Sequence, residues 1–325
     1  MKSTKRALIT GAYGQDGSYL SELLIAKGYE VFGVVKERLS DNSKKIKAIL
    51  AHNQIFINEV FCDLENILEI ENLLKIICPD EIYHLAAKNY SSEQGSDYME
   101  LDVYLNNVNS TFNLLRGLYQ FLPTAKFVTA GSCLMYDNTS ETPQTLNTQC
   151  KSKSFYGFAK ITEKNIVEFF RTKQLHASTA IFFNHDSPRR SVSYVSRKIV
   201  NNFVGIRNNK IETFELGNLD AVKEWGYAKD YAYALWLMAQ KKKPDDYMIC
   251  TGQGYSLRDY INIVCNILSI ENGFSHIRKN PDITFRKNNF ELIGDFSRTT
   301  KLLNWKPSIC FNDFVSLMVR AELQL

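Results

Sequence analysis

Short apolar runs alternate with amphipathic segments over the first half of the chain. Six runs have the length of a buried strand, at 7–9, 31–35, 55–61, 81–85, 127–130 and 179–183. Most segments between them have helical periodicity; within 65–77, for example, Ile67, Ile70 and Leu74 recur at the spacing of one helix face. Strands that are apolar throughout and alternate with helices predict a parallel sheet covered on both faces.

After about residue 185 the alternation loosens. Short strands are expected at 211–216 and 248–250, helices at 230–240, 257–268 and 311–322, and an irregular segment at 280–295. We therefore predict an α/β protein with a Rossmann-type doubly wound parallel sheet and a smaller, mixed C-terminal substrate domain. The expected boundary gives residues 1–184 to the sheet domain and 185–325 mainly to the second domain, with later crossings of the chain between them.

Composition excludes several classes of protein. The formal net charge is only +4 over 325 residues, with Lys and Arg scattered, so we expect no nucleic-acid partner. No apolar run approaches the roughly 18 residues that a membrane helix needs, so we expect no membrane association. The seven cysteines form no C-x-x-C pair and no cluster with histidine. Without a signal-peptide pattern, this favours a cytoplasmic protein with no metal site.

Three glycines, Gly11, Gly14 and Gly17, lie between the first strand and the first helix. This G-x-x-G-x-x-G spacing allows a tight turn and a close approach of the backbone to a pyrophosphate at the helix N-terminus. The sequence therefore predicts a dinucleotide site. Four more residues are expected at the cofactor because they lie in the same turn or follow the next strands of the sheet: Gln15, Asp16, Leu64 and Ala86.

The residues after the second and third strands bear on the choice of cofactor. An acidic residue after the second strand would favour NAD, whereas Lys36 and Arg38 suit a 2′-phosphate and favour NADP. NAD stays possible, because the two basic residues are also compatible with ordinary surface charge. Asp63, after the third strand, is expected either to accept from the adenine amino group or to cap the next helix.

Ser132, Tyr156 and Lys160 are the expected catalytic residues. Ser132 lies at the end of a predicted strand, and the Y-x-x-x-K spacing places Tyr156 and Lys160 on one helix face. A nearby ammonium should lower the pKa of the phenol, which could then take a proton from a hydroxyl group. Tyr194 and Lys198 repeat the spacing, but they follow the last predicted strand of the sheet and are not expected to be the catalytic pair.

These motifs resemble the extended short-chain dehydrogenases that modify nucleotide sugars, and more closely the GDP-mannose 4,6-dehydratase family. The similar blocks are "ALITGAYGQDGSYLSELLIAKGYEVFGVV", "FFNHDSPRRSVSYVSRKI", "LGNLDAVKEWGYAKDY" and "LNWKP". The resemblance implies a GDP-sugar substrate of the GDP-mannose or GDP-heptose type, and a homodimer or homotetramer in which the loop at 37–45 meets a neighbour. It also implies that two residues lie near the nucleotide, Asn184 and Arg189, and that four line the GDP-sugar site: Lys198, Asn218, Lys223 and Arg286. Lys223 replaces the usual arginine of the family, which keeps the charge but loses bidentate phosphate recognition.

One departure from the family's pattern concerns the reaction. The dehydratases have a glutamate two residues after the strand-end hydroxyl, whereas this chain has Leu134. If the strand stayed extended, Leu134 would point to the same side as Ser132, and leucine transfers no proton. We therefore expect hydride transfer at the sugar C4, by a dehydrogenase, a ketoreductase or a 4-epimerase. The alternatives are dehydration with a substitute base, from among Glu93, Asp137 and Glu141, and a catalytically idle binding protein.

Overall fold

The central element is a parallel sheet. The computed structural model describes residues 4–88, 97–281, 283 and 291–324. Within them, seven parallel strands form the sheet in the order β11-β6-β5-β4-β1-β2-β3, which is the doubly wound arrangement that the sequence predicts. The strands are β1 (Arg6–Thr10), β2 (Glu30–Val35), β3 (Asn58–Phe61), β4 (Glu81–His84), β5 (Lys126–Ser132), β6 (His176–Phe182) and β11 (Tyr247–Ile249).

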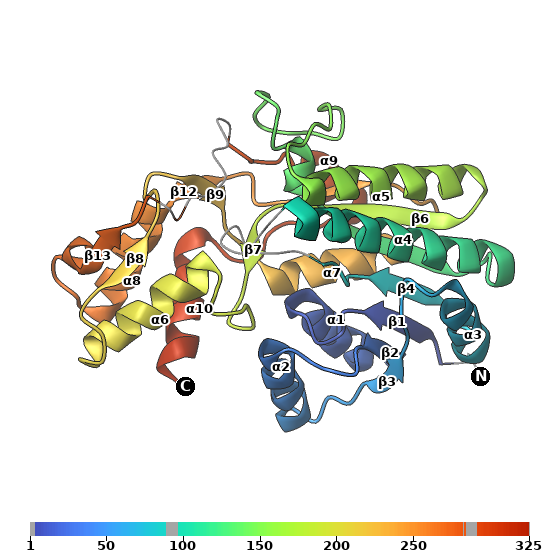
Figure 1. Cartoon of the computed structure of the whole chain (residues 1–325), viewed down its shortest axis with the longest axis horizontal. Coiled ribbons are helices and arrows are strands. Elements are labelled where there is room, and N and C mark those ends of the chain that lie inside the picture. Colours follow the sequence, from blue (N-terminus) through green and yellow to red (C-terminus); the bar gives the residue numbers. More distant parts are fainter. Residues whose placement is uncertain (1–3, 89–96, 282, 284–290, 325) are drawn as a thin grey trace.

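Helices cover both faces of this sheet (Figure 1). The core on one face is built with α1 (Gln15–Ala26), α7 (Ala228–Ala239) and α9 (Ser297–Leu303). The core on the other face is built with α3 (Ile67–Ile77), α4 (Asp97–Phe121) and α5 (Phe155–Thr172). The periodicity expected at 65–77 is confirmed, because Ile70, Leu74 and Ile77 of α3 are buried against the sheet. A further helix, α2 (Asp41–His52), lies beside β2 and β3.

A smaller lobe lies to one side of the central sheet (Figure 1), and it has its own core. Its helices are α6 (Val195–Arg207), α8 (Leu257–Leu268) and α10 (Phe311–Leu323). Two small sheets accompany them, one of β8 (Phe214–Leu216) with β13 (Ile277–Lys279) and one of β9 (Val222–Glu224) with β12 (Gly254–Ser256). The helices expected at 257–268 and 311–322 are thus confirmed.

The chain crosses between the two lobes several times. The strand expected at 248–250 is β11, which pairs with β6 at the edge of the central sheet and not with strands of the smaller lobe. Helices α7 and α9 also return to the central sheet. The parallel pair of β7 (His185–Asp186) and β10 (Gly226–Tyr227) joins the two lobes. Within the described part of the chain, no helix is long and apolar enough to cross a bilayer.

Candidate active site

The turn between β1 and α1 holds the three glycines. Gly11 has a φ of +73°, and its carbonyl oxygen accepts a hydrogen bond from the Gly14 amide at 2.8 Å. A Cβ at Gly17 would lie 2.2 Å from that oxygen, so only glycine lets α1 start this close to the turn. Gly14 precedes α1 without a side-chain cap, which leaves amide groups of the first helical turn available to a phosphate. The turn fits the pyrophosphate of a dinucleotide.

The side chains of Gln15 and Asp16 face the segment that joins the lobes. Gln15 Oε1 accepts a hydrogen bond from Ser187 Oγ at 2.9 Å, and Asp16 Oδ1 lies 3.0 Å from His185 Nε2. The other ring nitrogen of His185 lies 2.7 Å from the Phe183 carbonyl oxygen, so both nitrogens face acceptors, as in an imidazolium. Burial disfavours both charges, yet their mutual attraction raises the pKa of His185 and lowers that of Asp16. The two residues thus form an ion pair beside the glycine turn.

The residues expected at the adenosine end lie on three strand ends. Lys36 and Arg38 are exposed in the turn after β2. Asp63 Oδ1 accepts from the Glu65 amide at 3.0 Å, while Asn66 caps α3, so the expected capping role of Asp63 is wrong. Two further residues were expected here on position alone: Leu64, which packs at the edge of the α3–α4 core, and Ala86, whose amide donates to Thr10 Oγ1 at 3.0 Å.

The strand β5 ends at Ser132. From Cys133 to Tyr136 the chain forms a 3₁₀ turn, η1, and Ser132 Oγ accepts from the Leu134 amide at 3.2 Å. The strand alternation from which we expected Leu134 to point to the same side as Ser132 therefore does not hold, because Leu134 lies within a helical turn. A Cβ at Gly157 would lie 2.3 Å from the Leu134 carbonyl oxygen, so η1 packs tightly on the first turn of α5. Leu134 thus neighbours the helix turn that carries Tyr156.

Tyr156 and Lys160 lie on α5, which Ser154 caps by accepting from the Gly157 amide at 3.1 Å. Tyr156 is half-buried and Lys160 is buried, with its Nζ atom 5.8 Å from the centre of the tyrosine ring. Lys160 Nζ also lies 2.9 Å from Glu163 Oε2, a buried carboxylate that sequence reasoning did not find. The structure thus brings Ser132, Tyr156 and Lys160 to adjoining ends of β5 and α5.

The ionisation of Tyr156 differs from the expectation. Burial raises the pKa of Tyr156 above its ordinary value, and the Lys160 ammonium opposes this without outweighing it. The expected lowering of the phenol's pKa is therefore wrong for the protein alone. Burial also disfavours the Lys160 ammonium, but the charge and hydrogen bond of Glu163 together with the Tyr156 phenol outweigh this effect and raise the pKa of Lys160.

The two neighbouring arginines differ in their surroundings. Arg189 is buried against α1, where its guanidinium donates to Ser18 Oγ at 3.0 Å and pairs with Glu22. Its expected contact with the nucleotide stays a prediction. Arg190, which we did not predict, pairs with Asp186 at 3.0 Å and covers the Tyr194 ring at 3.6 Å. Asp186, Tyr194, Asp16 and Tyr156 all raise the pKa of Arg190, although burial opposes them, so its guanidinium lies near both the first turn of α1 and Tyr156 on α5.

The expected GDP-sugar residues lie on the smaller lobe or at the junction. Burial lowers the pKa of Lys223, on β9, to about 8, and the nearby Asp186, Cys133 and Arg190 have smaller effects on this pKa. Its position near Cys133, directly after β5, agrees with a place beside the candidate site. Lys198 is half-buried on α6, and the exposed Asn218 accepts from the Asp220 amide at 3.0 Å, as in a polar turn. Asn184 precedes β7, where its carbonyl oxygen accepts from the Gly226 amide at 3.0 Å. Arg286 lies outside the described residues.

The expected substitute bases have distinct environments. Asp137 is buried and accepts from the Lys153 amide at 2.8 Å and from Ser154 Oγ at 3.3 Å, so it holds the loop that leads into α5. Glu141 is exposed on a surface loop. Glu93 falls in a segment that the structure does not describe. Asp137 therefore has a structural role, and neither it nor Glu141 is directed by a described contact to Tyr156.

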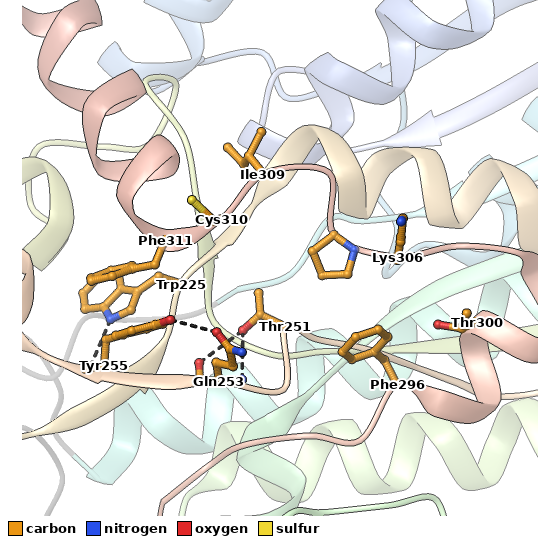
Figure 2. Close-up of a pocket in the computed structure, with 11 residues that line it drawn as sticks. Trp225, Thr251, Gln253, Tyr255, Phe296, Thr300, Lys306, Ile309, Cys310 and Phe311 are labelled. Atoms are coloured by element: carbon orange, nitrogen blue, oxygen red, sulfur yellow. Dashed lines mark hydrogen bonds between the residues drawn. The ribbon is translucent and has the colours of Figure 1, made fainter.

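A separate hollow of about 310 Å³ lies beside the β9–β12 pair (Figure 2). Its wall includes Trp225 and the stacked rings of Tyr255 and Phe311, whose centres are 4.0 Å apart. Neither Ser132 nor Tyr156 lines it. It therefore lies apart from the candidate residues at the ends of β5 and α5. Over the described ranges, no cluster of His, Cys, Asp and Glu is placed to hold a metal ion.

Comparison with known proteins agrees with this geometry. The GDP-mannose 4,6 dehydratase family model matches residues 8–318. A GDP-mannose 4,6 dehydratase from Cricetulus griseus is 34% identical, over 100% of this chain and 93% of the relative.

Solved structures share the fold at lower identity. A dTDP-glucose 4,6-dehydratase from Bacillus anthracis in complex with NAD has a TM-score of 0.83 and 18% identity, over 99% of this chain and 97% of that one. RMD from Pseudomonas aeruginosa complexed with NADPH has a TM-score of 0.79 and 19% identity, over 99% of both chains. The sequence matches decide the assignment: the chain belongs to the GDP-mannose 4,6-dehydratase family.

Proposed function

We propose that this protein is a GDP-sugar 4,6-dehydratase that starts its reaction by oxidising the sugar at C4. The observation that carries the proposal is the family match over residues 8–318, in a chain that keeps Ser132, Tyr156 and Lys160 at adjoining element ends. This places dehydration ahead of the C4 redox reaction that we expected from Leu134 alone. The names of the relatives support a GDP-mannose type of substrate, and the resemblance adds the GDP-heptose type.

Each catalytic side chain has a role that its position supports. Ser132 Oγ, at the end of β5, can hydrogen-bond the 4-hydroxyl, and Tyr156 takes its proton. The Lys160 ammonium stabilises the phenolate and orients the nicotinamide ribose. The nicotinamide, when bound, supplies the acceptor and later the donor of the hydride. Exposed Lys36 and Arg38 support NADP over NAD.

Dehydration also needs a group that takes the C5 proton. Leu134 cannot do this, and the contacts of Asp137 give it another role. Three groups remain as candidates: Glu93, the exposed Glu141, and Lys223, whose pKa of about 8 lets a neutral amine form at mildly alkaline pH. Loss of product from Glu93→Gln, Glu141→Gln or Lys223→Met, with C4 oxidation retained, would identify the base.

A second candidate function is a C4 dehydrogenase, ketoreductase or epimerase, and Leu134 is the observation that favours it. The two functions separate in heavy water. Incubation with a panel of GDP-sugars and NADP, followed by mass spectrometry, should give a 6-deoxy-4-keto product with one solvent deuterium at C5. A C4-oxidised or C4-inverted product without deuterium at C5 would support the second function instead.

A matched pair of variants tests whether chemistry occurs at this site. Tyr156→Phe should reduce turnover by roughly a hundredfold or more, since a positioned base contributes that much. Tyr233→Phe, at an exposed ring on α7, should leave turnover unchanged. Unaltered biological activity in Tyr156→Phe would instead favour a protein that only binds its ligands.

The protein is also proposed to form a homodimer or homotetramer in the cytoplasm. The support is a row of exposed apolar side chains on the neighbouring helices α4 and α5, a composition suited to a contact with a second copy. These side chains are Leu101, Leu105, Phe112, Tyr119, Phe158 and Phe169.

A further inference from the structure

Lys160 forms a buried ion pair with Glu163, which lies about one helical turn further along α5. Its Nζ atom lies 2.9 Å from Glu163 Oε2, and the two side chains are only 3% and 2% exposed. Tyr156, Lys160 and Glu163 are spaced by four and three residues, so all three lie along one face of α5. The carboxylate therefore lies on the side of Lys160 that is further along the helix from Tyr156.

The pair is enclosed by other elements of the sheet domain. Thr111 on α4 donates a hydrogen bond to Glu163 Oε2 at 3.1 Å. His84, at the end of β4, lies near enough to Lys160 for their charges to interact, but burial lowers its pKa to about 3 and keeps it neutral. A buried ammonium is strongly unfavourable unless it has a counter-charge. Glu163 supplies that charge from within the same helix.

Glu163 also acts on Tyr156. Burial raises the pKa of Tyr156, the Lys160 ammonium lowers it, and the Glu163 carboxylate raises it again; Tyr194 and Cys133 face the phenol and add smaller effects. Glu163 thus has two effects on this site. Its carboxylate keeps the Lys160 ammonium charged, and it also opposes the lowering of the Tyr156 pKa by that ammonium.

We propose that Glu163 is a positioning residue of this active site, which holds the Lys160 ammonium in place and thereby sets the pH range in which Tyr156 accepts a proton. The proposal rests on the proposed function, because it assumes that Tyr156 is the base of C4 oxidation. Neither the family motif nor the spacing of the catalytic residues assigns a role to this position.

The test is the pH profile of kcat/KM for C4 oxidation in Glu163→Gln. The amide keeps the size and one acceptor but removes the charge, so the phenolate becomes easier to form and the buried ammonium harder to keep. Both limbs of the profile should therefore move to lower pH, by about one pH unit. A rate that falls equally at every pH, with both limbs unmoved, would show a merely structural role and overturn the proposal.

Two further variants give matched comparisons. Glu168→Gln makes the same change on the same helix, where the carboxylate pairs with Lys164 and is 43% exposed, and its profile should match the wild type. Glu163→Asp keeps the charge, and its limbs should stay near the wild-type pH values even if the rate falls. If Glu163→Gln does not fold, Thr111→Val provides the test, since loss of the donor to Glu163 should shift the limbs while leaving the helix charges intact.

A substrate-free measurement separates this proposal from the proposed function. The ionisation of Tyr156 is followed by ultraviolet difference absorbance, as the wild-type titration minus that of Tyr156→Phe, and again in a Glu163→Gln background. A lower tyrosine pKa in that background supports the role of Glu163 even if no GDP-sugar is turned over. An unchanged tyrosine pKa refutes it, whatever the substrate proves to be.

Discussion

At the scale of single residues, the surroundings of the buried His84 predict how the stability of the fold depends on pH. The Thr10 hydroxyl oxygen accepts from the amides of Leu85 and Ala86, so its only proton is left to donate to His84 Nδ1 at 2.8 Å. This arrangement requires an unprotonated Nδ1. It agrees with the effect of burial, which lowers the pKa of His84 to about 3.

We predict that the free energy of unfolding falls as the pH drops below about 6.5. In the unfolded chain His84 binds a proton near that pH, whereas in the folded chain it does so only near pH 3. Between these values this group costs about 1.4 kcal/mol of stability per pH unit. Urea unfolding of His84→Gln should show a shallower loss between pH 7 and pH 5. The exposed His52→Gln should keep the wild-type slope, and equal slopes in all three proteins would contradict the assignment.

Two groups of the candidate site, Arg190 and Glu163, were not predicted from the sequence. Arg189 and Arg190 are adjacent in the sequence, and nothing in "SPRRS" indicates that Arg189 packs on α1 while Arg190 pairs with Asp186. Glu163 did carry a signal, since it lies three residues after Lys160 on the face that holds Tyr156. That spacing predicts a contact, but only the structure shows that the pair is buried.

At the scale of secondary-structure elements, long periodic segments were predictable and short turns were not. Helices such as α3, α8 and α10 follow the hydrophobic pattern because one face of each is buried. Strands such as β1 and β4 are apolar runs because helices cover both faces of the sheet. The end of β5 lacks such a pattern. The 3₁₀ turn η1 begins there because Ser132 bonds the Leu134 amide, a local contact that periodicity does not report.

Leu134 on η1 is the element-scale test of how dehydration proceeds. If another group already takes the C5 proton, as proposed, Leu134→Glu should change the rate of solvent deuterium entry at C5 by less than tenfold. Leu134→Gln controls for size and polarity. A gain of roughly a hundred- to ten-thousand-fold in the glutamate variant alone would show that the wild type has no base there and works only at C4.

At the scale of the whole molecule, the exposed apolar row on α4 and α5 predicts how copies associate. Phe112→Lys should place a charge in the proposed contact and reduce the mass measured by light scattering to that of a monomer. Phe56→Lys, at a side chain that is 75% exposed elsewhere on the surface, should keep the wild-type mass. An oligomer that survives Phe112→Lys would assign the contact to another face.

The division of the chain into lobes was only partly predictable for a topological reason. A short apolar run such as 248–250 looks the same whether it joins a small sheet or the edge of a large one. Its partner is decided by where the intervening segments bring it. Here they return it to β6, far beyond the boundary expected at residue 184.

That late edge strand has a consequence for how the protein is made. On the ribosome, β6 emerges long before β11. The edge of β6 and the apolar face of the sheet that α7 covers therefore stay exposed until residues 228–249 have been translated. A fragment that stops at residue 184 should therefore aggregate when expressed, whereas the full chain, which supplies α7, β11 and α10, should be recovered from the soluble fraction. The sheet domain expected at residues 1–184 is thus completed only by α7 and β11, which are translated later.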